Sequence, residues 1–216
     1  MKPQTTISRA APRRFCAAEE GTTLVEFAIV LPLFLLLFLG LIDFGRLAFQ
    51  YVTIEKSVQM AARIAAVRPA ACAGVPSTNA RGSYVADPMP RYGTHCSFDA
   101  NLCAAAAPIQ CDATEAGVNS DVVSEIAAAL PFPVPAADLR FIYSYDPNLN
   151  FLGGPYVAAV TVEARQVPFT FITPLGGLVA MATGTAPTGG GDLNALTFPT
   201  LRATVPGEDL AQGMDG

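Results

Sequence analysis

A long apolar segment near the N-terminus is the feature that most constrains this chain. Residues 27–42 are 16 residues without a charged side chain. As an α-helix they would span about 24 Å, which is short of the ~30 Å hydrocarbon core of a bilayer. A helix that begins at Thr22 reaches about 31 Å and can cross. The sequence therefore predicts a transmembrane segment over residues 22–42, with an acidic residue, Glu26, inside its leading edge.

The pattern changes after the apolar segment, although no helix breaker follows before Pro69. Apolar side chains now recur every three or four positions: Phe44, Leu47, Ala48, Tyr51, Val52, Val58, Ala61, Ala62 and Ala65. This period is typical of an amphipathic helix. We expect one helix from about Thr22 to Val67, in which residues 43–68 continue the transmembrane segment. Two helices with a joint near Gly40 or Gly45 are the alternative.

Residues 1–21 form a polar leader ahead of the apolar segment. Its basic side chains predict that the leader stays in the cytoplasm, because such residues favour that side of a membrane. A cleaved secretory signal would need small residues after its apolar core, and no convincing A-x-A site follows this one. An uncleaved signal anchor fits better, but it gives Glu26 no role.

The residues around Gly21 combine several features: the polar leader, the glycine, a glutamate five positions later, an LP pair inside the span and the exit sequence DFGR. In this combination EEGTTLVEFAIVLPLFLLLFLGLIDFGR, followed by QMAARIAA, resembles the TadE-like family of tight-adherence (Flp-type, type IVb) pilus assembly proteins, which are pseudopilins. The resemblance covers residues 19–68. It implies that a prepilin peptidase cuts between Gly21 and Thr22 on the cytoplasmic side, and that Thr22 becomes the mature N-terminus.

Such a cut would give the acidic residue in the span a role. It creates an ammonium group at Thr22, and Glu26 lies four residues later on the same helix face. In an apolar surrounding, an ammonium and a carboxylate are each costly alone and much less costly as a pair. The resemblance further implies that Glu26 meets the N-terminus of a neighbouring subunit and sets the axial register of assembly.

The cysteines divide in a way that agrees with this cleavage. Cys16 lies in the leader, and the other four follow the span: Cys72, Cys96, Cys103 and Cys111. Removal of the leader leaves these four on the oxidising side of the membrane, where two disulfides can form in any of three pairings. The alternative is a metal site of His95 and the last three cysteines, whose spacing lacks the C-x-x-C hairpin common in structural zinc sites.

Residues 69–186 predict a small α+β domain with an antiparallel sheet. Residues 69–118 are rich in Pro, Gly, Ala and Cys, which indicates a loop region held by disulfides. NSDVVSEIAAALP (residues 119–131) predicts a short helix, with Asn119 or Ser120 as its cap and Pro131 as its stop.

Alternating apolar residues then predict an antiparallel meander. The strands are LRFIYSY (residues 139–145), YVAAVTVEA (156–164) and VPFTFIT (167–173), and LVAMATGTA (178–186) can add a fourth. Residues 187–216 have too little apolar matter to pack, so they predict a flexible tail.

The composition limits the function. The chain has 13 basic against 18 acidic side chains and no basic patch, which argues against nucleic-acid binding. One histidine and no tryptophan leave little material for His-based catalysis. We expect no enzymatic activity, no cofactor, no bound metal and no small-molecule substrate.

We therefore expect a single-pass protein of the inner membrane, with a cytoplasmic N-terminus and residues 69–186 in the periplasm. The resemblance implies as partners the prepilin peptidase, other pilins or pseudopilins and the tight-adherence secretion machinery. The sequence leaves open whether the chain enters an extracellular pilus or stays in the membrane as an assembly factor. An uncleaved bitopic periplasmic scaffold and a tethered binding domain of the secretion machinery are the alternatives.

Overall fold

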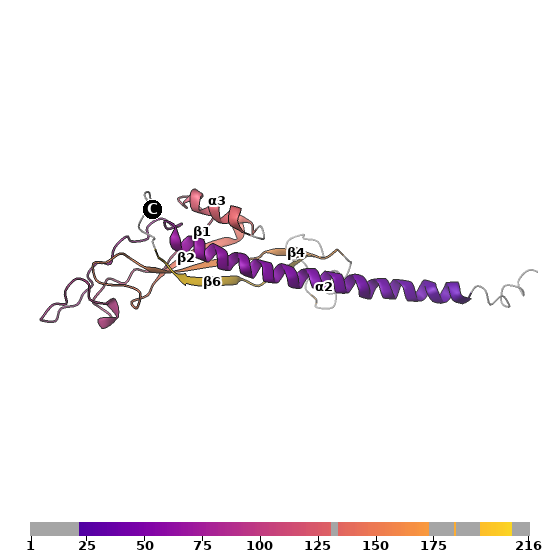
Figure 1. Cartoon of the computed structure of the whole chain (residues 1–216), viewed down its shortest axis with the longest axis horizontal. Coiled ribbons are helices and arrows are strands. Elements are labelled where there is room, and N and C mark those ends of the chain that lie inside the picture. Colours follow the sequence, from indigo (N-terminus) through magenta and orange to yellow (C-terminus); the bar gives the residue numbers. More distant parts are fainter. Residues whose placement is uncertain (1–21, 131–133, 173–183, 185–194, 209–216) are drawn as a thin grey trace, which may run out of the picture. The chain divides into compact units, whose positions relative to one another are not determined.

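The computed structural model describes residues 22–130, 134–172, 184 and 195–208. The chain divides into two compact units, of which the first ends at Gly45 and the second begins at Arg46. Helix α2 (Thr22–Val67) is one continuous helix of 46 residues, drawn in indigo and purple in Figure 1. The predicted helix over these residues is confirmed, and the alternative of two joined helices is wrong.

The second unit contains a four-stranded antiparallel sheet with the strand order β1-β2-β3-β6. Its strands are β1 (Ile109–Asp112), β2 (Leu139–Tyr145), β3 (Ala158–Ala164) and β6 (Leu201–Pro206). Two short strands, β4 (Pro168–Thr170) and β5 (Ala195–Thr197), pair with each other. The remaining elements are helix α3 (Ser120–Ala129) and the 3-10 helices η2 (Cys96–Phe98) and η3 (Ala136–Asp138). The predicted α+β class with an antiparallel sheet is confirmed.

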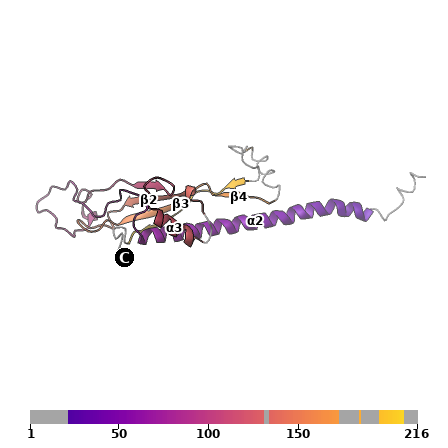
Figure 2. The same cartoon turned by 90° about the horizontal axis from the view of Figure 1, so that it is seen from above.

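The core of this unit lies between the sheet and two helices. The C-terminal half of α2 and helix α3 supply apolar side chains to the same buried cluster as the inward face of the sheet (Figure 2). The buried side chains include Ile54, Val58, Ala61 and Ala65 of α2, Val122 and Ile126 of α3, Phe141 and Tyr143 of β2, and Val160 and Val162 of β3. Both helices therefore cover one face of the sheet.

Helix α3 begins as the sequence predicts. Of the two predicted caps, Asn119 fills the role, because its side-chain oxygen accepts hydrogen bonds from the backbone N–H of Asp121 (3.1 Å) and Val122 (3.5 Å). The helix ends at Ala129, and the predicted stop at Pro131 lies outside the described residues.

The predicted strands β2 and β3 are confirmed, but the meander is wrong after β3. Gln166, a non-glycine residue with φ of 54°, turns the chain out of the sheet, so β4 pairs with β5. The place beside β3 is taken by β6. The fourth strand predicted over residues 178–186 falls almost wholly outside the described residues.

The prediction of a flexible tail over residues 187–216 is wrong for residues 195–208. Strand β6 alternates half-buried and exposed residues, and Leu201, Ala203 and Val205 pack against the core. Three apolar side chains are enough for an edge strand because only one of its faces is buried.

Strand β1 is also a correction, because residues 69–118 were expected to form only loops. It lies at one edge of the sheet, where the backbone N–H of Asp112 donates to the Glu115 carboxylate at 3.2 Å. At the other edge, β6 ends in Pro206, which has no N–H to offer. Such features protect sheet edges against the addition of further strands.

The rest of the 69–118 region is an ordered loop cluster. The side-chain amide of Asn79 donates to the side-chain oxygen of Asn150 at 2.9 Å, and both residues are buried. A Cβ atom on Gly82 would clash with the carbonyl oxygen of Asn101, so only glycine fits there. The cluster has its own small core, which contains Leu102 and Leu152.

Candidate functional site

The residues predicted to take part in processing lie at the start of α2. Thr22 is the first residue of the helix, whereas Gly21 lies outside the described residues. Glu26 follows one helical turn after Thr22 and is exposed. The structure thus places the carboxylate where a second chain could reach it, and cleavage itself stays a prediction.

The helix around Glu26 is apolar on all sides. Every Leu, Ile, Val and Phe from Leu24 to Ile42 is exposed. A monomer in water rarely exposes a contiguous apolar surface of this extent. By length and composition α2 can cross a membrane, so the helix is compatible with single-pass anchoring.

The exit sequence DFGR leads into a contact with the sheet unit that sequence reasoning missed. The guanidinium carbon of Arg46 lies 5.6 Å from the centroid of the Phe169 ring, which is a cation–π distance. The Gln50 side chain, one turn later, donates to the carbonyl of Pro168 at 3.5 Å. Strand β4 is thereby attached to α2 where the helix enters the unit. The alternation in VPFTFIT predicts a strand that contains Phe169 but carries no signal for Arg46.

Among the described residues, nothing requires a glycine at position 45. A Cβ atom on Gly45 would meet none of their atoms within 4 Å. The neighbouring Asp43, by contrast, is almost fully buried, with 1% of its surface exposed. The two residues of the exit sequence therefore differ, because only Asp43 is enclosed.

The four cysteines after the span form the two predicted disulfides. Cys72 bonds Cys111, with Cα atoms 5.6 Å apart, and Cys96 bonds Cys103, with Cα atoms 5.5 Å apart. The first ties the segment just after α2 to β1. Close by, the backbone N–H of Ala71 donates to the buried hydroxyl of Tyr143 at 2.8 Å, and burial raises the pKa of this tyrosine.

The alternative metal site does not fit this pairing. Cys96 and Cys103 share a disulfide, so neither thiolate is available as a ligand. A ring nitrogen of His95 lies 2.7 Å from the Ser97 hydroxyl, and the ring packs edge-on against Phe151 at 4.7 Å. His95 therefore has a structural place at the start of η2.

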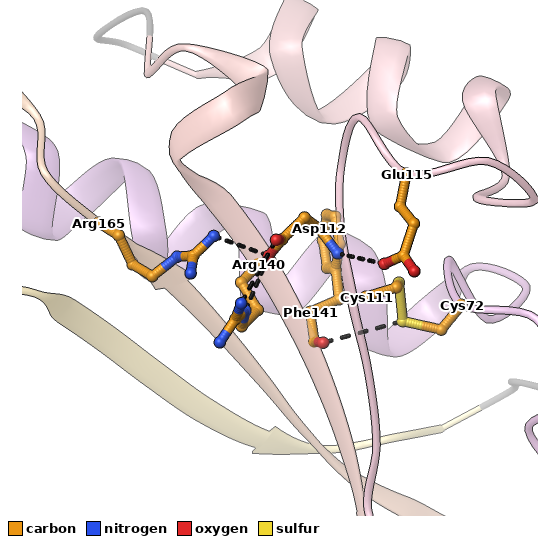
Figure 3. Close-up of polar contacts among 7 residues, drawn as sticks. All are labelled: Cys72, Cys111, Asp112, Glu115, Arg140, Phe141 and Arg165. Atoms are coloured by element: carbon orange, nitrogen blue, oxygen red, sulfur yellow. Dashed lines mark hydrogen bonds and ion pairs between the residues drawn. A yellow bond between two sulfur atoms is a disulfide. The ribbon is translucent and has the colours of Figure 1, made fainter.

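A charged cluster joins three segments on the other side of the sheet from the helices (Figure 3). The Asp112 carboxylate accepts hydrogen bonds from Arg140 Nε and Arg165 Nη2, both at 2.7 Å. The bond from Arg140 is the main cause that holds the pKa of Asp112 below its usual value, while partial burial acts in the opposite direction. The cluster links β1, β2 and the end of β3.

Two hollows in the described part of the unit are open and modest. One, of about 190 Å³, is lined by residues that include Asp138, Arg165 and Thr200. The other, of about 340 Å³, lies between the end of α2 and β6 and includes Arg63 and Glu208. Neither lining contains a histidine or a cysteine. The absence of enzymatic activity stays a prediction.

Comparison with protein families gives one match, which lies almost wholly within α2. Residues 21–63 match the family model described as TadE-like protein, so the resemblance predicted from the sequence is confirmed over these residues. No curated protein and no solved structure matches the chain. The match covers most of α2, and the sheet lies outside it.

Proposed function

We propose that this TadE-like chain is a pilin-like component of a Tad pilus system and is required for assembly of its Flp-type pili. A prepilin peptidase removes residues 1–21, residues 22–42 cross the inner membrane, and the sheet unit lies in the periplasm. The family match over residues 21–63 carries the proposal, because it begins at the glycine of the expected cleavage site.

The continuous helix supports this role. Residues 22–42 are one stretch of α2 with exposed apolar side chains on all sides, which suits lipid before assembly and neighbouring helices after it. Glu26 is exposed within this surface. An acid in such a place is costly unless it finds a partner, and the new ammonium group of a neighbouring chain's Thr22 is a matching one.

The disulfides support export of the sheet unit. Such bonds persist in oxidising compartments, of which the periplasm is one. Basic residues in the leader favour a cytoplasmic N-terminus, which puts the two ends of α2 on opposite sides of the membrane. The chain then acts through contacts with other pilins and the secretion machinery, and it is a substrate of the peptidase rather than an enzyme.

The test compares wild type with Glu26→Gln, and uses Glu55→Gln, an exposed glutamate of the same helix beyond the span, as the matched control. Mass spectrometry of membrane-extracted protein should find Thr22 as the N-terminus in cells with the peptidase and Met1 in cells without it. Glu26→Gln should be cleaved but should lower pilus number tenfold or more.

Two results would contradict the proposal. An intact leader in cells that express the cognate peptidase would favour the uncleaved scaffold. Normal piliation in Glu26→Gln would remove this carboxylate from assembly.

A further inference from the structure

Four charged residues form a row across the sheet, and their signs alternate. Asp112 pairs in register with Arg140, Arg140 with Glu163, and Glu163 with Arg202. Directly opposed side chains on neighbouring strands lie about 5 Å apart at Cβ. The row therefore reads negative, positive, negative, positive from β1 to β6.

The row lies on the face of the sheet that the helices leave open. Residues next to the row on each strand, such as Cys111, Phe141 and Val162, belong to the core that α2 and α3 cover. Successive side chains of a strand point to opposite faces, so the charges point away from both helices.

Beyond the row, the four strands carry no charge on the open face, and Arg165, just past the end of β3, is paired with Asp112 of the row. The next rows of the open face consist of Gln110, Ile142, Thr161 and Thr204, and then of Ser144, Ala159 and Pro206. All of these residues are half-buried or exposed. Most are short, so a second flat surface could approach closely, as in the ~10 Å spacing of stacked sheets.

We propose that this face binds a second copy of the chain, related by a two-fold axis. The axis lies in front of the open face, runs parallel to the strands and is centred over the gap between β2 and β3. Rotation about this axis brings the two faces together and reverses the row in the second copy. Asp112 then faces Arg202 of the second copy, and Arg140 faces its Glu163. All four pairs across the interface are attractive, so the row is complementary to itself.

Other arrangements of the two faces lack this match. A two-fold axis along the row would leave its order unchanged and set Asp112 against Asp112 and Arg140 against Arg140. Like charges directly opposed destabilise an interface. Addition of a strand at either edge is hindered because Glu115 occupies the N–H of Asp112 and Pro206 has none.

The direction of the helices agrees with the axis. Within the sheet unit, α2 runs alongside the strands from Arg46 to Val67 in both views (Figures 1 and 2). Rotation about an axis parallel to the strands leaves this direction unchanged, so the Arg46 ends of both copies face the same way. Two chains anchored in one membrane need this orientation, a step that rests on the proposed function.

The size of the face sets the strength expected. Strands ~4.8 Å apart with a rise of ~3.4 Å per residue make the face roughly 20 Å by 20 Å, or about 400 Å² on each copy. This is below the roughly 800 Å² per partner of a standard stable interface. The pair should therefore be weak in solution and should form where anchoring in a membrane raises the effective concentration.

The test exchanges two charges between full-length chains in their membrane. Arg140→Glu alone sets the introduced carboxylate against Glu163 of the other copy, so two chains of this variant should repel each other. Glu163→Arg alone sets the introduced guanidinium against Arg140 of the other copy, with the same effect. A mixture of the two variants restores every attractive pair between one chain of each kind. Mixing cannot repair a folding defect, so rescue would report contact between copies.

The readout is a photo-cross-linking amino acid in place of Thr161, near the axis, with one in place of the exposed Ala128 of α3 as the control. Wild type should give a cross-linked pair of copies at position 161 and none at position 128. Each single variant should lower the yield at position 161 about fivefold or more, which corresponds to about 1 kcal/mol, and the mixture should restore it.

The proposal is overturned if position 161 cross-links to no second copy, if the single variants match wild type, or if the folded variants are not rescued by mixing. Protease resistance shows whether each variant folds. If one does not, Arg202→Glu at the exposed end of the row replaces it as a single variant outside the mixing test, and it should also lower the yield. Absence of the chain from the membrane fraction would contradict the proposed function, whereas a membrane-bound chain without the cross-link contradicts only this inference.

Discussion

The two halves of helix α2 have the same backbone and opposite surroundings. From Leu24 to Ile42 every large apolar side chain is exposed. From Arg46 to Val67 one face is buried, with Ile54 at 0% exposure, while Lys56 and Arg63 lie on the exposed side. The first half must find its partner in lipid or in other chains, whereas the second half finds its partner in its own sheet.

This difference separates anchoring from folding. Changes in the sheet unit should alter the free energy of unfolding and leave membrane attachment intact. Changes on the exposed half of α2 should alter membrane attachment and leave the free energy of unfolding intact. The three predictions below test this separation, and each is measured on the full chain in detergent micelles or membranes.

Loss of the Cys72–Cys111 disulfide should have the largest effect, because it joins the segment just after α2 to the sheet. The bond closes a loop with a sequence separation of 39. The chain-entropy model gives about 4 kcal/mol for a loop of this length. Replacement of both cysteines by serine should lower the thermal midpoint of the sheet unit, followed by near-ultraviolet circular dichroism. The chain should still sediment with membranes.

The Cys96–Cys103 disulfide is the matched control, since its sequence separation is only 7. The same model gives about 2.5 kcal/mol for this loop. Its loss should loosen the loop cluster more than the contact between α2 and the sheet. Equal losses of stability for the two pairs would show that the link to α2 has no special weight.

The helix and two strands could be predicted because their signals are local. Helical spacing from Phe44 to Ala65 and alternation in LRFIYSY each lie within one stretch of sequence. Strand β6 was missed because LRATVP is short, with only three alternating apolar residues and a proline at its end. Strand β1 is shorter still, with four residues. Both are edge strands, and it is pairing with β2 and β3 that holds them in the sheet.

The candidate functional residues also divide into those with a local signal in the sequence and those that only the fold brings together. The glycine, the glutamate and the exit sequence are contiguous, so they could be recognised from sequence. The charged row could not, because Asp112, Arg140, Glu163 and Arg202 meet only through strand register. The contact of Arg46 with Phe169 likewise depends on where the chain turns at Gln166.

Matched isoleucines test the two halves directly. Ile54 is fully buried against the sheet, and Ile29 is 66% exposed. Ile54→Ala should cost about 3 kcal/mol in unfolding free energy, because it leaves a cavity in the core. Ile29→Ala should leave that free energy within about 0.5 kcal/mol of wild type. Denaturant unfolding of both variants measures this. A comparable loss in both would show that the exposed half takes part in the folding of the sheet unit.

Lowering the pH should reduce the unfolding free energy of the sheet unit, and this is the smallest of the predicted effects. Because Arg140 and then Arg165 hold the folded-state pKa of Asp112 below its usual value of about 3.9, the ionised carboxylate stabilises the fold above about pH 4. This contribution is lost as the pH falls through the lowered folded-state pKa. It should amount to about 1 kcal/mol, since 35% of the Asp112 side chain is exposed to solvent.

The measurement is the unfolding midpoint of wild type and Asp112→Asn at pH 6 and at pH 3, with Glu55→Gln as an exposed control on α2. Asp112→Asn should be the less stable protein at pH 6, and the gap to wild type should narrow at pH 3. The unfolding midpoint of Glu55→Gln should change between the two pH values as it does in wild type. A gap that stays constant between the two pH values would mean that the shape of Asp112, rather than its charge, holds β1 to β2.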